Sequence, residues 1–277
     1  MAKYTVSPAL KKQWIKMEQK EQSFLEKQYE KGPSPVEDTV EKYVPEKLHD
    51  TLNTAFLKAF ELVFTRGTGF IEKTCRPEKH RAMYRMSSEA AADSQTHRTE
   101  GAYARNSGSS RRKNLLLSGA EGLGMGILGI GIPDIPVFTA VILKSLYETA
   151  MSYGFSYDTE EEQIFLLKLI ETSMCHGDAL YENDRRINQY IYRKTPLAPD
   201  CAAQMQAASD SMAAELICMK FVQTIPVAGV VGGLYDVVFL NRILKYADCK
   251  YQRRHLYAKI AEKKGNTEPE QKQQYDF

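Results

Sequence analysis

The stretch that decides the fold is LLLSGAEGLGMGILGIGIPDIPVFTAVIL, which runs from Leu115 to Leu143. Its first half sets six glycines among bulky aliphatic side chains. A glycine lacks a Cβ, so another backbone can approach it closely, but inside a helix it costs about 1 kcal/mol relative to alanine. Six glycines in one apolar run therefore indicate close packing between helices or a break in a helix.

Two prolines divide this stretch. Pro133 and Pro136 cannot continue a helix from upstream, because proline lacks a backbone donor and its ring clashes with the preceding turn. Asp134 lies between them, where its carboxylate can accept hydrogen bonds from the first amides of the next helix. We therefore expect two helical pieces with a kink at Pro133-Asp134.

A second stretch of the same character, TIPVAGVVGGLYDVVFL, runs from Thr224 to Leu240 and also contains an aspartate, Asp236. Missing side chains at two distant places suggest that residues 119–136 and 225–236 pack against each other at the centre of the molecule. The residues of this predicted helix-packing or ligand site are Gly122, Gly124, Gly126, Gly129, Pro133, Asp134, Pro136, Pro226, Gly229, Gly232, Gly233 and Asp236.

Length and composition indicate a folded domain with a large core. The chain has 277 residues, of which 43% are hydrophobic. Its 37 basic and 35 acidic residues nearly balance, so the net charge does not favour nucleic acid as a partner. Five widely spread cysteines without a CxxC pair are typical of reduced thiols, and the charged N-terminus has no apolar signal segment. We expect a cytoplasmic protein without a conventional transmembrane helix, because no uncharged apolar run reaches 18 residues.

Apolar residues recur at helical spacing along most of the chain, and no strand-like alternation of useful length is present. The sequence predicts an all-α fold, a single bundle-like domain of about eight helices around the two glycine-rich central helices. The main expected helices cover residues 8–32, 46–66, 136–153, 158–177, 178–194, 200–223 and 236–264.

The chain divides by composition into an N-terminal amphipathic helix (1–35), an all-α domain (36–264) and a polar, disordered tail (265–277). Within the domain, residues 76–113 are poor in large aliphatic side chains and predict a polar basic loop or a loosely attached helix. The last helix has an apolar first half. Its second half is basic, and we expect it to present a basic face formed by Lys245, Lys250, Arg253, Arg254, Lys259, Lys263 and Lys264.

No motif in the sequence predicts catalysis, a cofactor or a metal. The GxGxxG pattern at Gly124–Gly129 lacks the preceding strand of a dinucleotide site, and no Gly-Lys-Ser/Thr follows it. Cys175-His176 is a lone neighbouring pair at a helix end, whereas zinc needs four converging ligands. Asp134 and Asp236 have two interpretations: each caps a helix, or the two form a proton-linked or ligand-binding pair.

Three segments together resemble one family. The IPDIP turn, the segment AMSYGFSYD at 150–158 and the segment IPVAGVVGG at 225–233 are similar in order and spacing to the EcsC protein family, over roughly Val44 to Tyr257. The resemblance implies a relative of bacterial proteins named for a gene beside an ABC transporter, with no established enzymatic activity or cofactor. Glu121, inside the glycine run, departs from the simplest form of the pattern.

The glycine stretches have two interpretations. They are central helices that cross closely in a soluble core, or broken apolar hairpins that dip into the bilayer, anchored by Arg111-Arg112-Lys113 and the basic last helix. Glu121, Asp134 and Asp236 favour the core, because carboxylates are costly in hydrocarbon.

From these features we expect a non-enzymatic accessory or scaffold protein, peripheral at the cytoplasmic face of the membrane and associated with transport. Its expected partner is the inner-membrane surface or a membrane transporter component. The alternative is an enzyme or a small-ligand or lipid-binding protein with a pocket between the two glycine-rich stretches.

Overall fold

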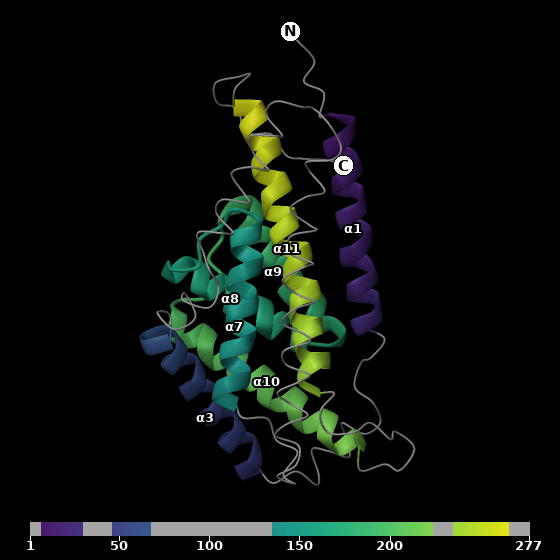
Figure 1. Cartoon of the computed structure of the whole chain (residues 1–277). Coiled ribbons are helices and arrows are strands. Elements are labelled where there is room, and N and C mark those ends of the chain that lie inside the picture. The colour runs from purple at the N-terminus through teal and green to yellow at the C-terminus, as the bar shows by residue number, and fades with distance from the viewer. Residues whose placement is uncertain (1–6, 30–45, 68–134, 224–234, 266–277) are drawn as a thin grey trace.

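The computed structural model describes residues 7–29, 46–67, 135–223 and 235–265 (Figure 1). These residues form seven α-helices and one π-helical turn and contain no strand, which confirms the all-α fold class. The helices are α1 (Pro8–Tyr29), α3 (Glu46–Leu62), which the π turn Val63–Gly67 continues, α7 (Ile135–Ser152), α8 (Glu160–Met174), α9 (Gly177–Arg193), α10 (Cys201–Gln223) and α11 (Tyr235–Gly265).

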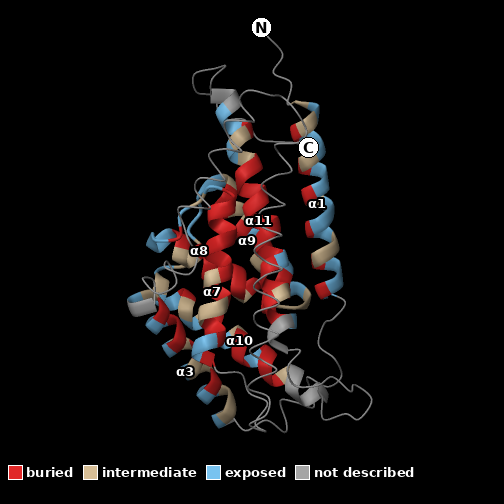
Figure 2. Cartoon of the chain, in the orientation of Figure 1, coloured by how far each residue is buried: buried red, intermediate tan, exposed pale blue. Residues whose placement is uncertain are grey.

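The helix α11 is the central element of the bundle. It contacts α1, α7, α8 and α9, while α10 packs across α3 and α8 (Figure 1). Buried residues run along α7, α8 and α11, whereas α1 buries one side and exposes the other (Figure 2). The main hydrophobic core therefore lies between α11 and the helices on the side away from α1.

The first helix begins where the sequence predicts it. The backbone N–H of Leu10 donates to the Ser7 hydroxyl at 3.3 Å, so Ser7 caps α1 and Pro8 takes its first position. Leu10, Trp14 and Met17 are buried at helical spacing. They form a small second core with Leu256 and Ile260, near the end of α11. The start of α1 therefore packs against the C-terminal part of α11.

The helices α7 and α8 also follow local signals in the sequence. Gly154, with φ of +84°, comes two residues after the last residue of α7, as expected for a helix stop. The Thr159 side chain accepts from the Glu162 N–H at the start of α8, and three glutamates occupy its first turn. Carboxylates are favourable there because they face the positive end of the helix dipole.

One predicted helix end is wrong. The sequence assigns Gly177 as the residue that closes α8, but α8 ends at Met174 and Gly177 is the first residue of α9. Only Cys175 and His176 separate the two helices, so the chain must turn sharply, and Gly177 does this with φ of +53°. A Cβ at this position would meet no atom within 4 Å, so the backbone conformation, not crowding, requires glycine.

Among the described helices, none combines the length and hydropathy that are needed to cross a bilayer.

Candidate functional site

The site predicted from the sequence falls largely outside the described residues. Pro136 is the exposed second residue of α7, and Asp236 lies in the first turn of α11, where its side chain is not described. The predicted contact between the two glycine-rich stretches, and a pocket between them, therefore stay predictions. The residues that lie outside are Gly122, Gly124, Gly126, Gly129, Pro133, Asp134, Pro226, Gly229, Gly232 and Gly233.

The charges on α11 correct another prediction. Of the five cations of the expected basic face whose side chains are described, three are buried: Lys250 is 0% exposed, Arg253 7% and Arg254 9%. Lys245 alone among the described lysines of this helix is fully on the surface. The reason is that carboxylates from α1, α8 and α9 meet the buried cations, and such pairing offsets the cost of removing a charge from water.

Lys250 joins three helices. Its Nζ donates to Glu21 Oε1 of α1 at 3.0 Å and to Asn188 Oδ1 of α9 at 2.8 Å, and it lies 2.7 Å from Asp184 Oδ1. The Tyr246 hydroxyl donates to the same Asp184 oxygen at 2.8 Å. The ammonium therefore has three oxygen partners, which use its full donor capacity.

Arg253 completes this cluster from the next turn of α11. Its Nε and Nη2 donate to the two oxygens of Glu21 at 3.0 and 3.1 Å, and its guanidinium lies 5.3 Å from the centre of the Trp14 ring. Burial by itself would raise the pKa of Glu21, but the charges of Lys250 and Arg253 outweigh it and hold that pKa below its ordinary value. Glu21 is thus an ionised carboxylate inside the protein.

Arg254 points to the other side of α11, toward α8. It makes two parallel hydrogen bonds to the Glu162 carboxylate, of 2.8 and 3.0 Å, and its guanidinium lies 4.2 Å from the ring centres of both Phe155 and Phe165. The Tyr251 hydroxyl donates to Glu162 at 2.5 Å. Burial would lower the pKa of Arg254, but Glu162 more than compensates and raises it. A bidentate pair between aromatic rings is the geometry that suits arginine best.

A third buried cluster lies at the C-terminal end of α1, near Gln28. Arg242 Nη1 donates to Glu215 Oε1 of α10 at 2.5 Å, and His176 Nε2 lies 2.9 Å from the other Glu215 oxygen. His176 Nδ1 is 3.2 Å from the backbone oxygen of Gln28. Burial would lower the pKa of His176, but the hydrogen bond and charge of Glu215 raise it above its ordinary value. Both partners are acceptors, so a protonated imidazole can donate to each.

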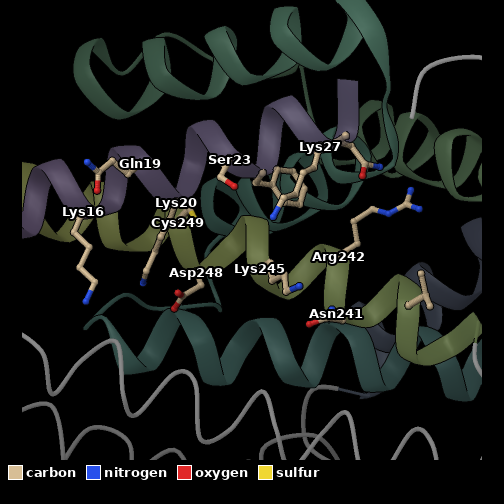
Figure 3. Close-up of a pocket in the computed structure, with 13 residues that line it drawn as sticks. Lys16, Gln19, Lys20, Ser23, Lys27, Asn241, Arg242, Lys245, Asp248 and Cys249 are labelled. Atoms are coloured by element: carbon tan, nitrogen blue, oxygen red, sulfur yellow. The ribbon is translucent and has the colours of Figure 1, made fainter. Parts of the chain in front are cut away.

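The bundle also has an open groove between α1 and α11, with a volume of about 660 Å³ (Figure 3). Its lining is mainly basic, with five cationic side chains and one carboxylate, Asp248. The groove-lining residues are Lys16, Gln19, Lys20, Ser23, Phe24, Lys27 and Gln28 from α1, and Val238, Asn241, Arg242, Lys245, Asp248 and Cys249 from α11.

The groove presents exposed positive charge to a ligand. Lys16, Lys20, Lys27 and Lys245 are exposed, and within the described residues no salt bridge engages them. The Asp248 carboxylate is buried and accepts from the Tyr153 hydroxyl at 2.8 Å. In the described part of the chain, no group of three or more His, Cys, Asp or Glu side chains could hold a metal ion.

Sequence reasoning missed the buried clusters and the groove. One signal was available: Glu21 occupies a position in the apolar stripe of α1, between Met17 and Leu25, where a charge is unexpected unless it is paired. The spacing of Lys250, Arg253 and Arg254 by three and one residues could not show which of them would be buried.

The comparison with family models gives a match to the EcsC protein family over residues 10–256. No curated protein and no solved structure matches the chain. The matched span begins inside α1 and ends inside α11, so it includes both walls of the groove and the residues Glu21, Lys250 and Arg253 that join them. Because the match covers far more than half of the sequence, the chain belongs to the EcsC protein family.

Proposed function

We propose that this chain is a non-enzymatic accessory protein that acts by binding, at the anionic cytoplasmic face of the membrane, in association with transport. The observation that carries the proposal is the division of charge in the bundle. The buried cations of α11 pair with carboxylates from other helices, while the exposed lysines of the α1–α11 groove are not engaged by described carboxylates.

This division favours binding over catalysis. A catalytic acid or base must be reachable by its substrate, but Glu21, Glu162 and Glu215 are buried and each accepts from at least one arginine. Exposed lysines are suited to an anionic surface, since each one near such a membrane contributes about 1 kcal/mol of attraction.

Vesicle sedimentation tests the proposal. We expect the full chain to bind vesicles that contain phosphatidylglycerol but not vesicles of phosphatidylcholine alone, and we expect high salt to release it, because salt screens exposed charges. Equal recovery with both vesicle types, or no binding to either, would refute the membrane half of the proposal.

A second candidate is a small-ligand-binding protein. The volume of the groove lies within the range of small-molecule sites, roughly 300–1,000 Å³. Its described lining comes from α1 and α11, and of these residues Val238 belongs to the second glycine-rich stretch.

A further inference from the structure

We infer that the α1–α11 groove binds a phosphate-bearing ligand, whose phosphate lies among Lys27, Arg242 and Lys245. This inference does not depend on the membrane association proposed above, because a soluble phosphate ester and a lipid headgroup share the same recognition chemistry. It concerns one end of the groove, which differs from the other end in charge.

The cations at the two ends of the groove differ in whether a carboxylate of the lining lies near them. Helices α1 and α11 run side by side in opposite directions, so Lys27 lies near the start of α11 while Lys16 and Lys20 lie farther along it (Figure 3). Asp248, the only carboxylate among the described residues of the lining, lies on the side of Lys16 and Lys20 (Figure 3). The end with Lys27, Arg242 and Lys245 is therefore the better site for an anion.

Arg242 gives this end a fixed donor. It is 8% exposed, and Glu215 and Gln28 hold its guanidinium. In the amide orientation that satisfies both groups, the Gln28 side-chain oxygen accepts from Arg242 Nε at 3.2 Å and from Nη1 at 2.9 Å. Its Nη2 donates to no described residue. A planar guanidinium held on one edge presents its remaining N–H groups to a phosphate without further ordering.

The two lysines supply the net charge. Glu215 offsets the charge of Arg242, so Lys27 and Lys245 make this end positive. Both are exposed and can reach a bound oxyanion with their flexible side chains. Two or three cationic donors around one dianionic group are typical of phosphate sites, where charge-assisted hydrogen bonds are the strong ones.

The groove also has an apolar wall. Phe24 lines it and is held by stacking on Tyr246, with 5.1 Å between the ring centres. Val238 is 40% exposed and lines the same end. A ligand that fits has a phosphate monoester on a partly apolar body, such as a phosphorylated small metabolite or the headgroup region of a lipid.

The experiment uses the full chain and two probes. Phenyl phosphate, titrated by calorimetry, represents a soluble ester; vesicles of phosphatidylcholine with about 20 mol % phosphatidic acid represent the lipid source. The test variant is Lys27→Gln/Lys245→Gln. The matched control is Lys12→Gln/Lys58→Gln, which removes the same charge from two exposed lysines outside the groove. All four side chains are exposed, so both variants should keep the wild-type unfolding midpoint.

We expect the groove variant to weaken binding of at least one probe by about tenfold or more, and the control variant by less than about twofold. Loss with phenyl phosphate supports a soluble ligand, and loss with phosphatidic acid vesicles alone supports a lipid headgroup. Equal losses in both variants, or no binding of either probe by the wild type, would overturn the inference. Either result would leave the separate test with phosphatidylglycerol vesicles unchanged, so the phosphate site and the proposed membrane association can fail independently.

Discussion

Lys250 Nζ lies 3.0 Å from Glu21 Oε1, although 229 positions separate the two residues in the chain. The ammonium is fully buried and the carboxylate side chain is 5% exposed. This pair, together with Arg253, ties the first helix of the bundle to the last one. The attachment of α1, and with it one wall of the groove, therefore depends on a buried charge cluster as well as on apolar contacts.

The substitution Glu21→Gln should destabilise the protein strongly. It would keep the size of the side chain but remove the carboxylate that Lys250 and Arg253 share, and leave Lys250 with Asp184 as its remaining carboxylate. Removing one partner of a buried ion pair costs about 3–5 kcal/mol. Urea unfolding measures this loss. The matched control is Glu26→Gln, on the exposed side of the same helix, for which a change within about 0.5 kcal/mol is expected. Equal effects of the two substitutions would contradict the role of the cluster.

Arg254→Lys tests the pair between α11 and α8. Lysine keeps the charge but cannot make two parallel bonds to Glu162 or stack its head group between Phe155 and Phe165, so we expect a loss of about 1–3 kcal/mol. The thermal unfolding midpoint is the readout. Arg186→Lys provides the control, because that arginine pairs with Glu182 on the surface. If the two conservative changes shift the midpoint alike, the bidentate geometry contributes little.

Gly177→Ala tests the turn between α8 and α9. The backbone φ of +53° is unfavourable for a residue with a Cβ, by about 1–2 kcal/mol, and no neighbouring atom lies within 4 Å of the added group. Gly177→Asn should cost less, because asparagine tolerates this conformation better than alanine. The measurement compares the free energies of unfolding of the two variants with that of the wild type. A larger loss with asparagine would indicate crowding at this turn and contradict the explanation.

The sequence was sufficient for features that depend on neighbouring residues. Local hydrogen bonds and the helix dipole mark helix ends at Ser7 before Pro8, at Gly154 after an apolar helix and at three glutamates after Thr159. The helix ends at these places lie within two residues of the predicted ranges. The all-α class follows from the same local periodicity.

The arrangement of charges could not be predicted in this way. A pattern of polar and apolar residues predicts that Lys250, Arg253 and Arg254 lie on the surface. It contains no information on the ion pairs that they form with carboxylates of α1, α8 and α9, which are distant in sequence. The groove is equally non-local, since its two walls come from opposite ends of the chain. The predicted glycine site stays a prediction, because most of its residues lie outside the described part.

His255 should make the protein less stable as the pH falls below neutrality. Its ring packs beside Tyr153, and Nδ1 lies 3.2 Å from the backbone oxygen of that residue. Burial, with a smaller effect from the charge of Lys259, lowers the pKa of His255 to about 3 from an ordinary value of 6.5. Between these values the unfolded chain binds a proton that the folded protein excludes. Because of His255, the free energy of unfolding should therefore decrease by up to about 1.4 kcal/mol for each unit by which the pH falls in this range.

The measurement compares urea unfolding of the wild type and His255→Gln from about pH 8.5 to pH 4.5. The wild type should lose stability relative to the variant below about pH 6.5, and the two curves should run parallel above about pH 7.5, where histidine is neutral in both states. His176, whose pKa is raised, acts with the opposite sign: its contribution is present below 6.5 and lost as the pH rises through its folded pKa. Since both proteins contain His176, its effect cancels in the difference. Parallel curves throughout the acidic range would mean that the folded protein admits the proton on His255, and that this ring is not shielded from water as the packing around Tyr153 indicates.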